Sequence, residues 1–428
     1  MSERATIYAL SSGRPPAAIS VIRISGPKAH EAGVRIAGSL PDARTVAVRE
    51  LSDPVSGELL DDALVLKFDS PASSTGEDVV EFQCHGGRAV VEALLSALGP
   101  IEGLRQAEPG EFTRRAFENG RIDLTEAEGL ADLIEAETES QRKAALALAE
   151  GGLRKEIERW QQEILSLSAR AERAIDYDEE EEATDPTLIA ACDALAGELR
   201  SWLARPRVEP LKDGVRVVVA GPPNSGKSSL INAIVGQDRA IVTDIPGTTR
   251  DHIEVPLSLA GVPLLLVDTA GLRETLDTVE AIGVARTAQL IEAADIVLWL
   301  GDDSLEAPNH PRLIRVHSKS DLPERPPAPK GSVAVSAMTG DGLKALLGAV
   351  AAEARSVLPS EGTIALNRRQ AAHIAEAAGA VDVARSANEL VIVAENLRQA
   401  RVAFNRLTGR AGVEEVLDAL FSRFCLGK

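Results

Sequence analysis

The stretch that decides the fold is Gly221-Pro-Pro-Asn-Ser-Gly-Lys-Ser228, which fits the pattern G-x-x-x-x-G-K-[S/T]. It follows the largely apolar run Val215–Ala220, which is interrupted by Arg216 and is typical of a buried parallel strand, and it precedes a helical run over Ser229–Val235. In that setting the loop N–H groups surround phosphates, helped by the helix N-terminus. Lys227 would bring charge to the β- and γ-phosphates, and Ser228 would ligate Mg²⁺. The alternative, a chance Gly-rich turn, does not explain the flanking strand and helix.

A second motif, Asp268-Thr-Ala-Gly271, follows the apolar run Leu264–Val267. An aspartate at this point can hold Mg²⁺ through water, and the glycine can offer its N–H to the γ-phosphate. Thr248 and Thr249 lie between the two motifs, where a switch loop would bring a threonine to the metal. Each signal alone is weak, but their order predicts a nucleotide and metal site.

The base is indicated by Ser318-Lys-Ser-Asp321, which follows the strand-like run Leu313–Val316. An aspartate carboxylate accepts both the N1–H and the 2-amino group of guanine, which adenine cannot match. Ser336-Ala-Met338 is spaced to add a backbone N–H to the guanine oxygen. The first motif resembles the Asn-Lys-x-Asp of translation-factor-like GTPases, with Ser318 in place of the asparagine. We expect weaker support of the base loop and weaker GTP binding; a plain loop is the alternative.

The residue after Gly271 is Leu272, where Ras-like proteins have a glutamine that orients the attacking water. Leucine cannot do this, so either hydrolysis is slow or another group orients the water. Because no arginine finger is evident, an additional cation near the leaving oxygen is also expected.

The pattern of expected helices and strands changes along the 428 residues, which predicts several domains. Residues 1–118 mix β-like runs (Ala18–Ile24, Ala63–Phe68, Asp78–Gln83) with a helix over Arg88–Leu98, as in an α+β domain. Residues 119–211 and 356–428 are helical, with a kink or break at Gly151–Gly152. Between them, residues 212–355 alternate strands and helices. The predicted fold is multidomain α/β, with a Ras-like P-loop domain inserted in an all-helical domain and preceded by an α+β domain.

The formal charge of −19 argues against a surface coated with basic groups, although a local basic groove is compatible with it. Cys84, Cys192 and Cys425 are too far apart in sequence to indicate a disulfide framework or zinc site. No signal peptide or membrane span is evident, so we expect a cytoplasmic protein without membrane contact.

Five stretches extend these motifs to a family resemblance across the chain. They are Val21-Ile-Arg-Ile-Ser-Gly26, Gly76-Glu-Asp-Val-Val-Glu-Phe-Gln-Cys-His-Gly-Gly87, Pro109-Gly-Glu-Phe-Thr-Arg-Arg-Ala-Phe117, Thr243-Asp-Ile-Pro-Gly-Thr-Thr-Arg-Asp251 and Phe424-Cys-Leu-Gly-Lys428. Together, and in this order, they resemble the MnmE (TrmE) family of tRNA-modification GTPases.

The resemblance implies a function. The family builds a carboxymethylaminomethyl or aminomethyl group on C5 of the wobble uridine of certain tRNAs. It acts with the FAD-dependent partner MnmG (GidA), in a heterotetramer or larger assembly. Its N-terminal domain forms the homodimer and binds a one-carbon carrier, 5-formyl- or methylene-tetrahydrofolate. Its GTPase domains pair across the nucleotide when K⁺ is present.

The resemblance also implies roles for single residues. Asn224, Thr243, Ile245 and Thr248 match the K⁺ site, which takes the place of an arginine finger. Ser228 and Thr249 match the Mg²⁺ ligands. Glu280 matches the glutamate that orients water, and Arg273 matches a switch arginine. The resulting GTP-binding set is Asn224, Ser225, Gly226, Lys227, Ser228, Ser229, Thr243, Asp244, Ile245, Pro246, Gly247, Thr248, Thr249, Asp268, Thr269, Ala270, Gly271, Ser318, Lys319, Asp321, Ser336, Ala337 and Met338.

For folate, the resemblance implies Arg23, Glu81, Arg121 and Lys428. A pterin presents a guanine-like edge that a carboxylate can read, and cations suit the glutamyl tail. From the residues alone, either arginine is as readily a surface ion pair. The resemblance associates Cys425 with modification, as a nucleophile or acid; a lone cysteine is otherwise usually a small buried apolar residue.

Two other functions fit parts of the sequence. A ribosome-assembly GTPase of the Era or Der kind shares the apolar residue after the Asp-Thr-Ala-Gly motif, but lacks the folate-like N-terminal motifs and the Phe-Cys-x-Gly-Lys terminus. A folate-binding module with an inactive GTPase domain is the other alternative, and Ser318 motivates it.

Overall fold

The computed structural model describes residues 4–177, 186–236, 240–242, 253–269, 287–301, 306–360, 363–411, 414–424 and 426–427. The chain divides into two compact units. The first comprises Met1–Ala131 with Asn405–Lys428, and the second comprises Asp132–Phe404. The first unit therefore joins segments from both ends of the sequence.

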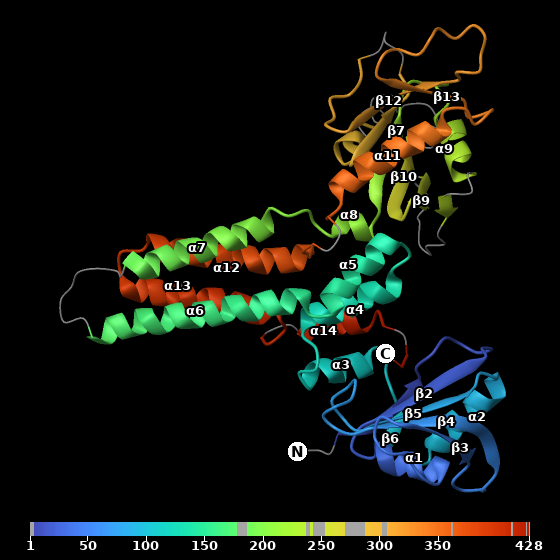
Figure 1. The fold of residues 1–428 in the computed structure, drawn as a ribbon, viewed down its shortest axis with the longest axis vertical. Coiled ribbons are helices and arrows are strands. Elements are labelled where there is room, and N and C mark those ends of the chain that lie inside the picture. Colours follow the sequence, from blue (N-terminus) through green and yellow to red (C-terminus); the bar gives the residue numbers. More distant parts are fainter. Residues whose placement is uncertain are drawn as a thin grey trace, which may run out of the picture. The chain divides into compact units, whose positions relative to one another are not determined.

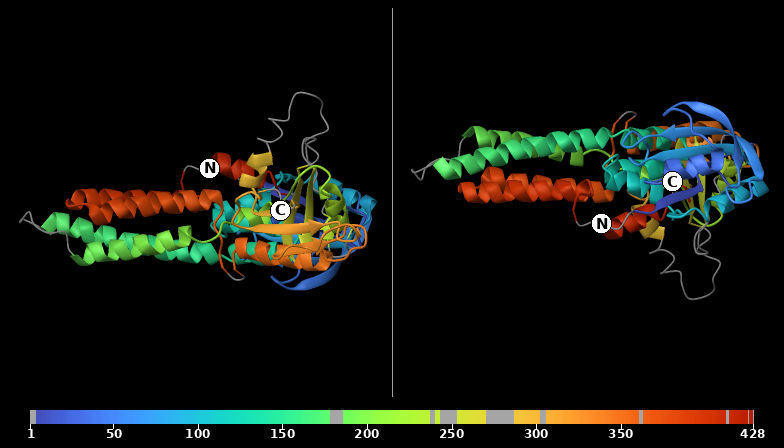
Figure 2. Two further views of the ribbon diagram at one scale, coloured as in Figure 1. Left: turned by 90° about the horizontal axis from the view of Figure 1, so that it is seen from above. Right: turned by 90° about the horizontal axis from the view of Figure 1, so that it is seen from below.

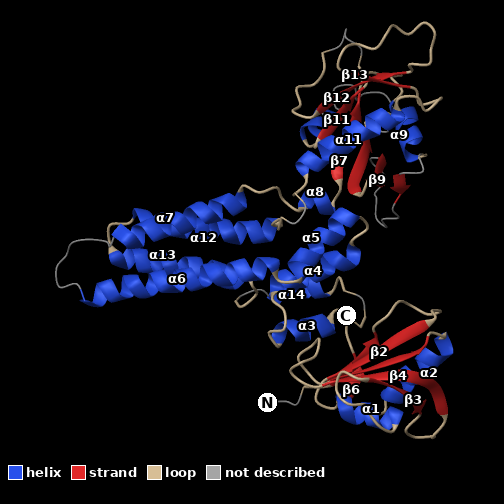
Figure 3. Cartoon of the chain, viewed as in Figure 1, coloured by secondary structure: helices blue, strands red, loops and turns tan. Residues whose placement is uncertain are grey.

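Among the described residues of the first unit, the strands form one sheet (Figure 3), which has six strands in the order β3-β4-β5-β2-β1-β6. β1 and β6 are parallel, and the other neighbours are antiparallel. The strands are β1 (Thr6–Leu10), β2 (Ile19–Ser25), β3 (Val46–Ser52), β4 (Leu59–Phe68), β5 (Val79–His85) and β6 (Leu104–Gln106). Alternation along the strands gives the sheet two apolar faces. Ile22 and Ile24 pack with α1 (Ala29–Ala37) and α2 (Arg88–Leu98), whereas Ile7 packs with Phe112 on the other face.

Three more helices complete the first unit: α3 (Glu111–Glu118), α4 (Leu124–Glu135), whose last turn belongs to the second unit, and α14 (Glu414–Phe421). Leu124 of α4 packs with Leu417 and Phe421 of α14 in one apolar cluster. Gly110 precedes α3 at a φ of +72°, and a Cβ there would lie 2.2 Å from the Phe421 carbonyl oxygen. A glycine is required at this contact, because any side chain would separate α3 from α14.

The second unit contains long helices that run side by side, α6, α7, α12 and α13 (Figures 1 and 2). The helices of this unit outside the sheet region are α5 (Glu139–Ala149), α6 (Gly152–Tyr177), α7 (Pro186–Leu203), α8 (Glu209–Lys212), α12 (Arg368–Ser386) and α13 (Leu390–Leu407). Trp160 of α6 is fully buried, 5.3 Å from Trp202 and 5.6 Å from Phe404 between ring centroids. This aromatic contact joins three of the helices.

The described strands of the second unit form a sheet in the order β13-β12-β11-β7-β10-β9-β8. They are β7 (Val215–Ala220), β8 (Ala240–Val242), β9 (Ile253–Leu259), β10 (Val262–Asp268), β11 (Ile296–Trp299), β12 (Leu313–Ser318) and β13 (Ser332–Val335). β9 is antiparallel to β10 and β8, and the other pairs are parallel. α9 (Lys227–Val235) and α11 (Leu343–Val357) cover one face, and helical residues 287–292 contribute to the other. β7 is apolar and buried from Val217 to Ala220, as expected for a strand covered on both faces, whereas the part-exposed Arg216 pairs with Glu254 of β9.

The predicted fold class is confirmed: this sheet lies in the chain between helices of the bundle and follows an α+β domain. β7 coincides with the predicted strand, and α2 with the predicted helix. α5 ends at Ala149 and α6 begins at Gly152, so the predicted kink is a break. The domain boundaries at 118, 211 and 355 stay a prediction. Within the described residues, no helix is both long and apolar enough to span a membrane.

Candidate functional site

The loop between β7 and α9 curls around the side chain of Lys227. The Lys227 ammonium donates to the Gly221 carbonyl at 3.1 Å and to the Pro222 carbonyl at 2.9 Å, and the residue is only 8% exposed. Asn224 has a φ of +60° and Gly226 a φ of +95°, so the loop makes two left-handed turns before the helix begins. Such alternation of backbone conformation directs successive N–H groups into a concave, anion-binding loop.

Two oxygen ligands meet beside this loop. The Ser228 hydroxyl donates to a carboxylate oxygen of Asp268 at 2.9 Å. Asp268 ends β10, whose parallel partner is β7, and the Thr269 hydroxyl fixes this edge by donating to the Val219 carbonyl at 2.8 Å. A hydroxyl and a carboxylate are ligands that Mg²⁺ prefers, so this pair fits a magnesium site.

The loop after β12 is tied to the phosphate loop by two hydrogen bonds. The buried Ser318 hydroxyl donates to the Ser225 carbonyl at 2.7 Å, and the Lys319 ammonium donates to the Asn224 carbonyl at 2.7 Å. Serine at position 318 thus retains a link between the base loop and the phosphate loop, where the sequence predicted weaker support.

A cavity of about 260 Å³ opens between these loops, lined by Gly226, Ser229, Leu230, Ser318, Lys319, Asp321, Leu322, Val335, Ala337 and Met338. One wall carries the Asp321 carboxylate, and aliphatic side chains supply others. The fully buried Ser336 hydroxyl accepts the Met338 N–H at 3.2 Å and the Thr339 N–H at 3.1 Å, which fixes the turn at the rim. The cavity combines the Asp321 carboxylate with apolar surface that suits a flat ring.

Sequence reasoning missed the apolar walls of this cavity, Leu230, Leu322 and Val335. Leu230 and Val335 belong to the regular apolar patterns of a helix and a strand, so nothing in their spacing marks them as ligand contacts. Leu322 directly follows Asp321, and its 48% exposure is the only unusual feature.

Several predicted site residues lie outside the described residues. They are Thr243, Asp244, Ile245, Pro246, Gly247, Thr248, Thr249, Ala270, Gly271, Arg273, Glu280, Cys425 and Lys428. The predictions for the K⁺ site, for the water-orienting glutamate and for the reactive cysteine therefore rest on sequence, apart from Asn224.

In the first unit, β2 and β5 bring two of the predicted folate residues together. Arg23 and Glu81 are register partners, and the Arg23 Nε donates to the Glu81 carboxylate at 2.8 Å. The Arg23 guanidinium also lies 5.6 Å from the centroid of the Phe112 ring. Phe112 was not predicted as a site residue, although it lies within the stretch 109–117 that carries the resemblance. Arg121 packs its aliphatic part against Gly76, at 3.1 Å from the position of a Cβ there.

The segment around Gly427 contacts the same sheet. The Ser11 hydroxyl donates to the Gly427 carbonyl at 2.8 Å, and Gly427 has a φ of +91°. A Cβ at Gly427 would lie 2.0 Å from the Leu10 carbonyl oxygen, so only glycine fits. Leu10 pairs with Ile22, the neighbour of Arg23. The glycine of the Phe-Cys-Leu-Gly-Lys motif therefore packs one register position from the Arg23–Glu81 pair.

The two described cysteines are poor nucleophiles. Burial, reinforced by the nearby Asp61 carboxylate, raises the pKa of the Cys84 thiol to about 11. Burial also raises the pKa of Cys192. Both thiols stay protonated at neutral pH, so neither suits a role that needs a thiolate.

Two family models match the chain: "MnmE helical domain" over residues 124–425, and "GTP-binding protein TrmE N-terminus" over residues 6–121. The chain is 51% identical to "tRNA modification GTPase MnmE" of Erythrobacter litoralis over 426 residues, covering 99% of this chain and 100% of that protein. It is 48% identical to the protein of the same name from Novosphingobium aromaticivorans over 435 residues, covering 99% of each. For that of Rhizorhabdus wittichii the identity is 51%, with 99% of this chain and 96% of that protein covered.

Proposed function

Because the chain belongs to the MnmE family of tRNA modification GTPases, we propose that its GTP hydrolysis serves to modify C5 of the wobble uridine in certain tRNAs. The group installed is carboxymethylaminomethyl or aminomethyl, and its one-carbon unit comes from 5-formyl- or methylene-tetrahydrofolate. One observation supports the GTPase part of this proposal. The phosphate loop, the Ser228–Asp268 pair and the base cavity all lie at the carboxyl ends of strands β7, β10 and β12 of the same sheet.

In this proposal Lys227 holds the β- and γ-phosphates, and Asp321 reads guanine. The Lys227 ammonium donates to two carbonyl groups of the loop, so it already lies in the space that the loop would enclose around the phosphates. The Asp321 carboxylate, with an N–H from the turn at 336–338, discriminates guanine from adenine because both carboxylate oxygens need donors on the base.

Ser228 and Thr249 would bind Mg²⁺ directly, with Asp268 holding it through water. Mg²⁺, when bound, neutralises charge between the β- and γ-phosphates. Asn224, Thr243, Ile245 and Thr248 would bind K⁺, which supplies the positive charge that an arginine finger supplies elsewhere. Glu280 orients the attacking water in place of the glutamine that Leu272 replaces, and Arg273 acts in the same switch.

For the folate carrier we propose Arg23, Glu81, Arg121 and Lys428. The Arg23–Glu81 pair beside the Phe112 ring offers a carboxylate, a cation and an aromatic face, which suit a pterin. The packing of Gly427 on Leu10 supports a contribution of Lys428 to the same site. Cys425, within that segment, is the proposed reactive thiol.

We further propose a homodimer through the N-terminal domain, acting with the FAD-dependent partner MnmG. Support for the dimer comes from an exposed apolar face at the edge of the first sheet. Val46 and Val48 of β3 are 56% and 63% exposed, and Leu64, the register partner of Val48, is 38% exposed. Such a face on an edge strand is characteristic of a protein interface.

The main test is mass spectrometry of wobble uridine in tRNA from cells that lack this chain. We expect the C5-modified nucleoside to be absent, to return with the wild-type chain, and not to return with Lys227→Ala. The exposed Arg88→Gln variant, as a control, should restore it. Unchanged nucleosides in the deletion strain would reject the proposal and favour the ribosome-assembly alternative, for which polysome profiles give an independent measurement.

The K⁺ role has a separate test. Turnover of GTP should be much faster in KCl than in NaCl at the same ionic strength, and Asn224→Ala should abolish that difference. Glu280→Ala should stop turnover while sparing GTP binding. Equal rates in the two salts would remove K⁺ from the mechanism without touching the tRNA proposal.

A further inference from the structure

The segment that follows the base loop, residues 322–330, has few backbone donors of its own. Four of its nine residues are proline: Pro323, Pro326, Pro327 and Pro329. A proline fixes φ and has no N–H group, so a regular ladder of backbone hydrogen bonds cannot hold such a segment. Hydrogen bonds from side chains, and bonds to its carbonyl groups, therefore matter more here than in an ordinary loop.

Two such hydrogen bonds join this segment to the end of β12. The Arg325 Nε donates to the Ser318 carbonyl at 3.0 Å, and the His317 Nε2 lies 3.0 Å from the Pro326 carbonyl oxygen. His317 is only 7% exposed, and a carbonyl oxygen can only accept, so the hydrogen lies on Nε2. Two successive residues of β12 are thus bound to two successive residues of the segment. Asp321 lies inside the loop that these bonds close.

Backbone hydrogen bonds shape the chain inside this closed loop. The Leu322 N–H donates to the Lys319 carbonyl at 3.2 Å, and the Arg325 N–H donates to the Leu322 carbonyl at 3.0 Å. Lys319 has a φ of +59°, a left-handed conformation that a lysine rarely adopts and that persists only where surrounding contacts enforce it. Bonds to the phosphate loop hold the chain at Ser318 and Lys319, and Arg325 holds it from the far end of the loop.

The direction of the Asp321 carboxylate depends on this loop. Asp321 is exposed and lines the base cavity. Among the residues that the structure describes, its side chain has no hydrogen bond or ion pair that would fix it, so the backbone that carries it sets its direction. Two hydrogen bonds to one flat base need both carboxylate oxygens in one plane. A small shift of the backbone therefore weakens both bonds.

We propose that Arg325 is a positioning residue for guanine recognition, because its bond to the Ser318 carbonyl holds the loop that directs Asp321 toward the base. The inference rests on the proposed function, in which Asp321 reads guanine. Ser318 carries two supports, since its hydroxyl donates to the Ser225 carbonyl while its own carbonyl accepts from Arg325. Part of the support that an asparagine would give at position 318 thus comes from the proline-rich segment.

Two substitutions at Arg325 separate its hydrogen bond from its charge. Arg325→Met keeps the side chain as long as the Nε position but removes the donor, whereas Arg325→Gln places an amide N–H at that position without the charge. In calorimetric titrations of the full-length chain, Arg325→Met should weaken GDP binding about 5- to 10-fold, and Arg325→Gln should restore most of it. An equal loss in both variants would exclude the hydrogen bond as the cause.

The selective measurement compares GDP with inosine diphosphate, whose base lacks the 2-amino group. A displaced Asp321 costs GDP two hydrogen bonds and inosine diphosphate one, so Arg325→Met should lower the preference for GDP. Because unfolded chains bind neither nucleotide, the ratio of the two affinities reports on folded protein alone. For GTP turnover, KM should rise while kcat stays unchanged. An equal loss for both nucleotides would mean that Arg325 only stabilises the domain.

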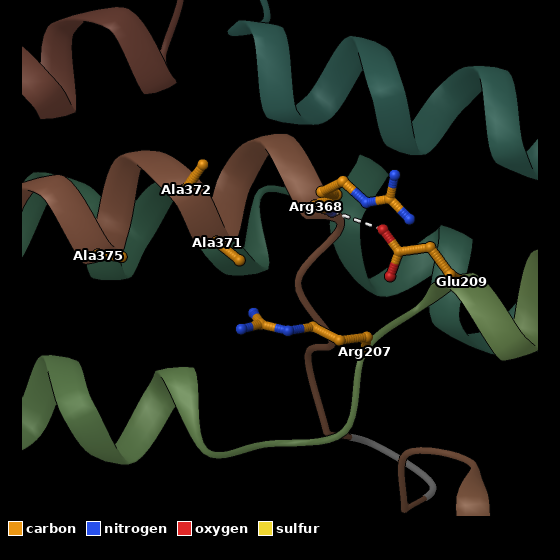
Figure 4. A pocket seen from close by; sticks show the side chains of 6 residues that line it. All are labelled: Arg207, Glu209, Arg368, Ala371, Ala372 and Ala375. Atoms are coloured by element: carbon orange, nitrogen blue, oxygen red, sulfur yellow. Dashed lines mark hydrogen bonds between the residues drawn. The ribbon is translucent and has the colours of Figure 1, made fainter. Parts of the chain in front are cut away.

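Arg368→Met is the matched control. Arg368 is exposed at the start of α12, and its backbone N–H, which the substitution retains, donates to the Glu209 carboxylate at 2.6 Å (Figure 4). Both nucleotides should bind this variant as they bind the wild type. A lower preference for GDP in Arg368→Met would show that the ratio responds to loss of any arginine, and would overturn the inference.

A double variant decides whether Arg325 acts through Asp321. In the Asp321→Asn background, Arg325→Met should have little further effect on GDP binding, because the group that it positions is already changed. The same loss in both backgrounds would overturn the inference. If Asp321→Asn alone leaves the ratio of the two affinities unchanged, the proposed role of Asp321 fails. If Asp321→Asn lowers this ratio and Arg325→Met does not, the inference alone fails.

Discussion

The nucleotide site of the second unit and the Arg23–Glu81 site of the first unit both lie on sheets, but they are assembled differently. At the nucleotide site, loops after separate parallel strands are tied to each other, Ser318 to Ser225 and Lys319 to Asn224, and a cavity stays open between them. At the other site, two antiparallel neighbours place opposite charges side by side, and these charges satisfy each other.

The difference concerns preorganisation. Hydrogen bonds between the two loops hold the nucleotide site together without using Asp321, so a nucleotide would meet a formed site. A ligand at the proposed folate site must either extend the Arg23–Glu81 pair or separate it, and separating a part-buried ion pair costs binding energy. We therefore expect single substitutions to have larger effects at the nucleotide site.

The largest effect is expected for Lys227→Ala. Removing the ammonium takes a charge away from the transferred phosphoryl group, and such losses reduce turnover about 10²- to 10³-fold. Single-turnover hydrolysis of radiolabelled GTP measures it. Binding of 5-formyltetrahydrofolate by the same variant should match wild type; a loss of folate binding would show that the two sites are not independent.

The next effect is on base choice. Asp321→Asn replaces one acceptor oxygen with an N–H donor, which opposes the donors of guanine but complements the 2-oxo group of xanthine. We expect GTP affinity to fall about 10²-fold and XTP affinity to rise, measured by competition with a fluorescent nucleotide. A uniform loss for both nucleotides would mean that Asp321 only supports the loop.

At the first unit, Arg23→Gln and Glu81→Gln should each weaken 5-formyltetrahydrofolate binding about 10-fold, as expected for loss of one charged hydrogen bond. GTP turnover should be unchanged. Because the two side chains pair, the double variant should lose less than the product of the single losses. Fully additive losses would indicate that the ligand does not contact the pair as a unit.

A smaller effect is expected for Ser318→Ala, which removes one buried hydrogen bond between loops. Loss of about 0.5–1.5 kcal/mol should weaken GTP binding about 2- to 12-fold. Ser318→Asn tests whether the asparagine usual in translation-factor-like GTPases improves on serine, while Ser320→Ala is a neighbouring exposed control. Calorimetric titration with GDP compares the three variants, and an unchanged affinity in Ser318→Ala would show that Lys319 alone suffices.

The smallest effect on activity, none, is expected for Glu111→Gln, which instead changes stability with pH. Burial acts to raise the pKa of Glu111, but hydrogen bonds from Arg105, from the Glu108 N–H and from Arg115 together lower it to about 2. The folded pKa is thus below the ordinary 4.5, so the stabilisation is complete above about pH 4.5 and is lost as the pH falls toward 2.

Thermal unfolding of the wild type and Glu111→Gln from pH 7 to pH 2.5 measures this. The wild type should be more stable at pH 7, and the difference should shrink below pH 4.5. Glu31→Gln, in an exposed i,i+4 pair with Arg35 of the same unit, should show little difference at any pH. A constant difference across the range would mean that the charge of Glu111 is not what stabilises the fold.

The sequence predicted local structure best around the phosphate loop, where one local rule fixes several residues. The phosphate loop requires a strand, a loop of fixed length and a helix, so β7 and α9 could be predicted from the same stretch. The link from Ser318 to Ser225 joins residues 93 apart and depends on how two loops meet, which no local pattern contains. The sequence therefore predicted weaker support of the base loop from this serine, and its effect on GTP affinity stays a prediction.

In the first unit, too, contacts between distant residues could not be predicted from the sequence, for a physical reason. Neither Arg23 nor Glu81 shows a partner in its own strand, because their contact depends on the register of β2 and β5. Phe112 contacts Arg23 from helix α3, and the only sequence signal that marks Phe112 is its position in the stretch 109–117 that carries the resemblance. The roles of Thr243, Glu280 and Cys425 remain predictions, since these residues lie outside the described part of the chain.

The packing of Gly427 on Leu10 has a consequence for biosynthesis. The Ser11–Gly427 hydrogen bond joins residues 416 positions apart, so the ribosome makes one partner long before the other. The first sheet can pair its own strands early, as N-terminal domains do during translation. The end of β1 at Leu10, which Gly427 covers in the finished chain, stays uncovered until the helical bundle and the GTPase domain have been made. A product that stops before Gly427 can contain a complete GTPase domain and still leave Leu10 uncovered, so GTP turnover would not distinguish it from the longer chain, whereas binding at the proposed folate site would.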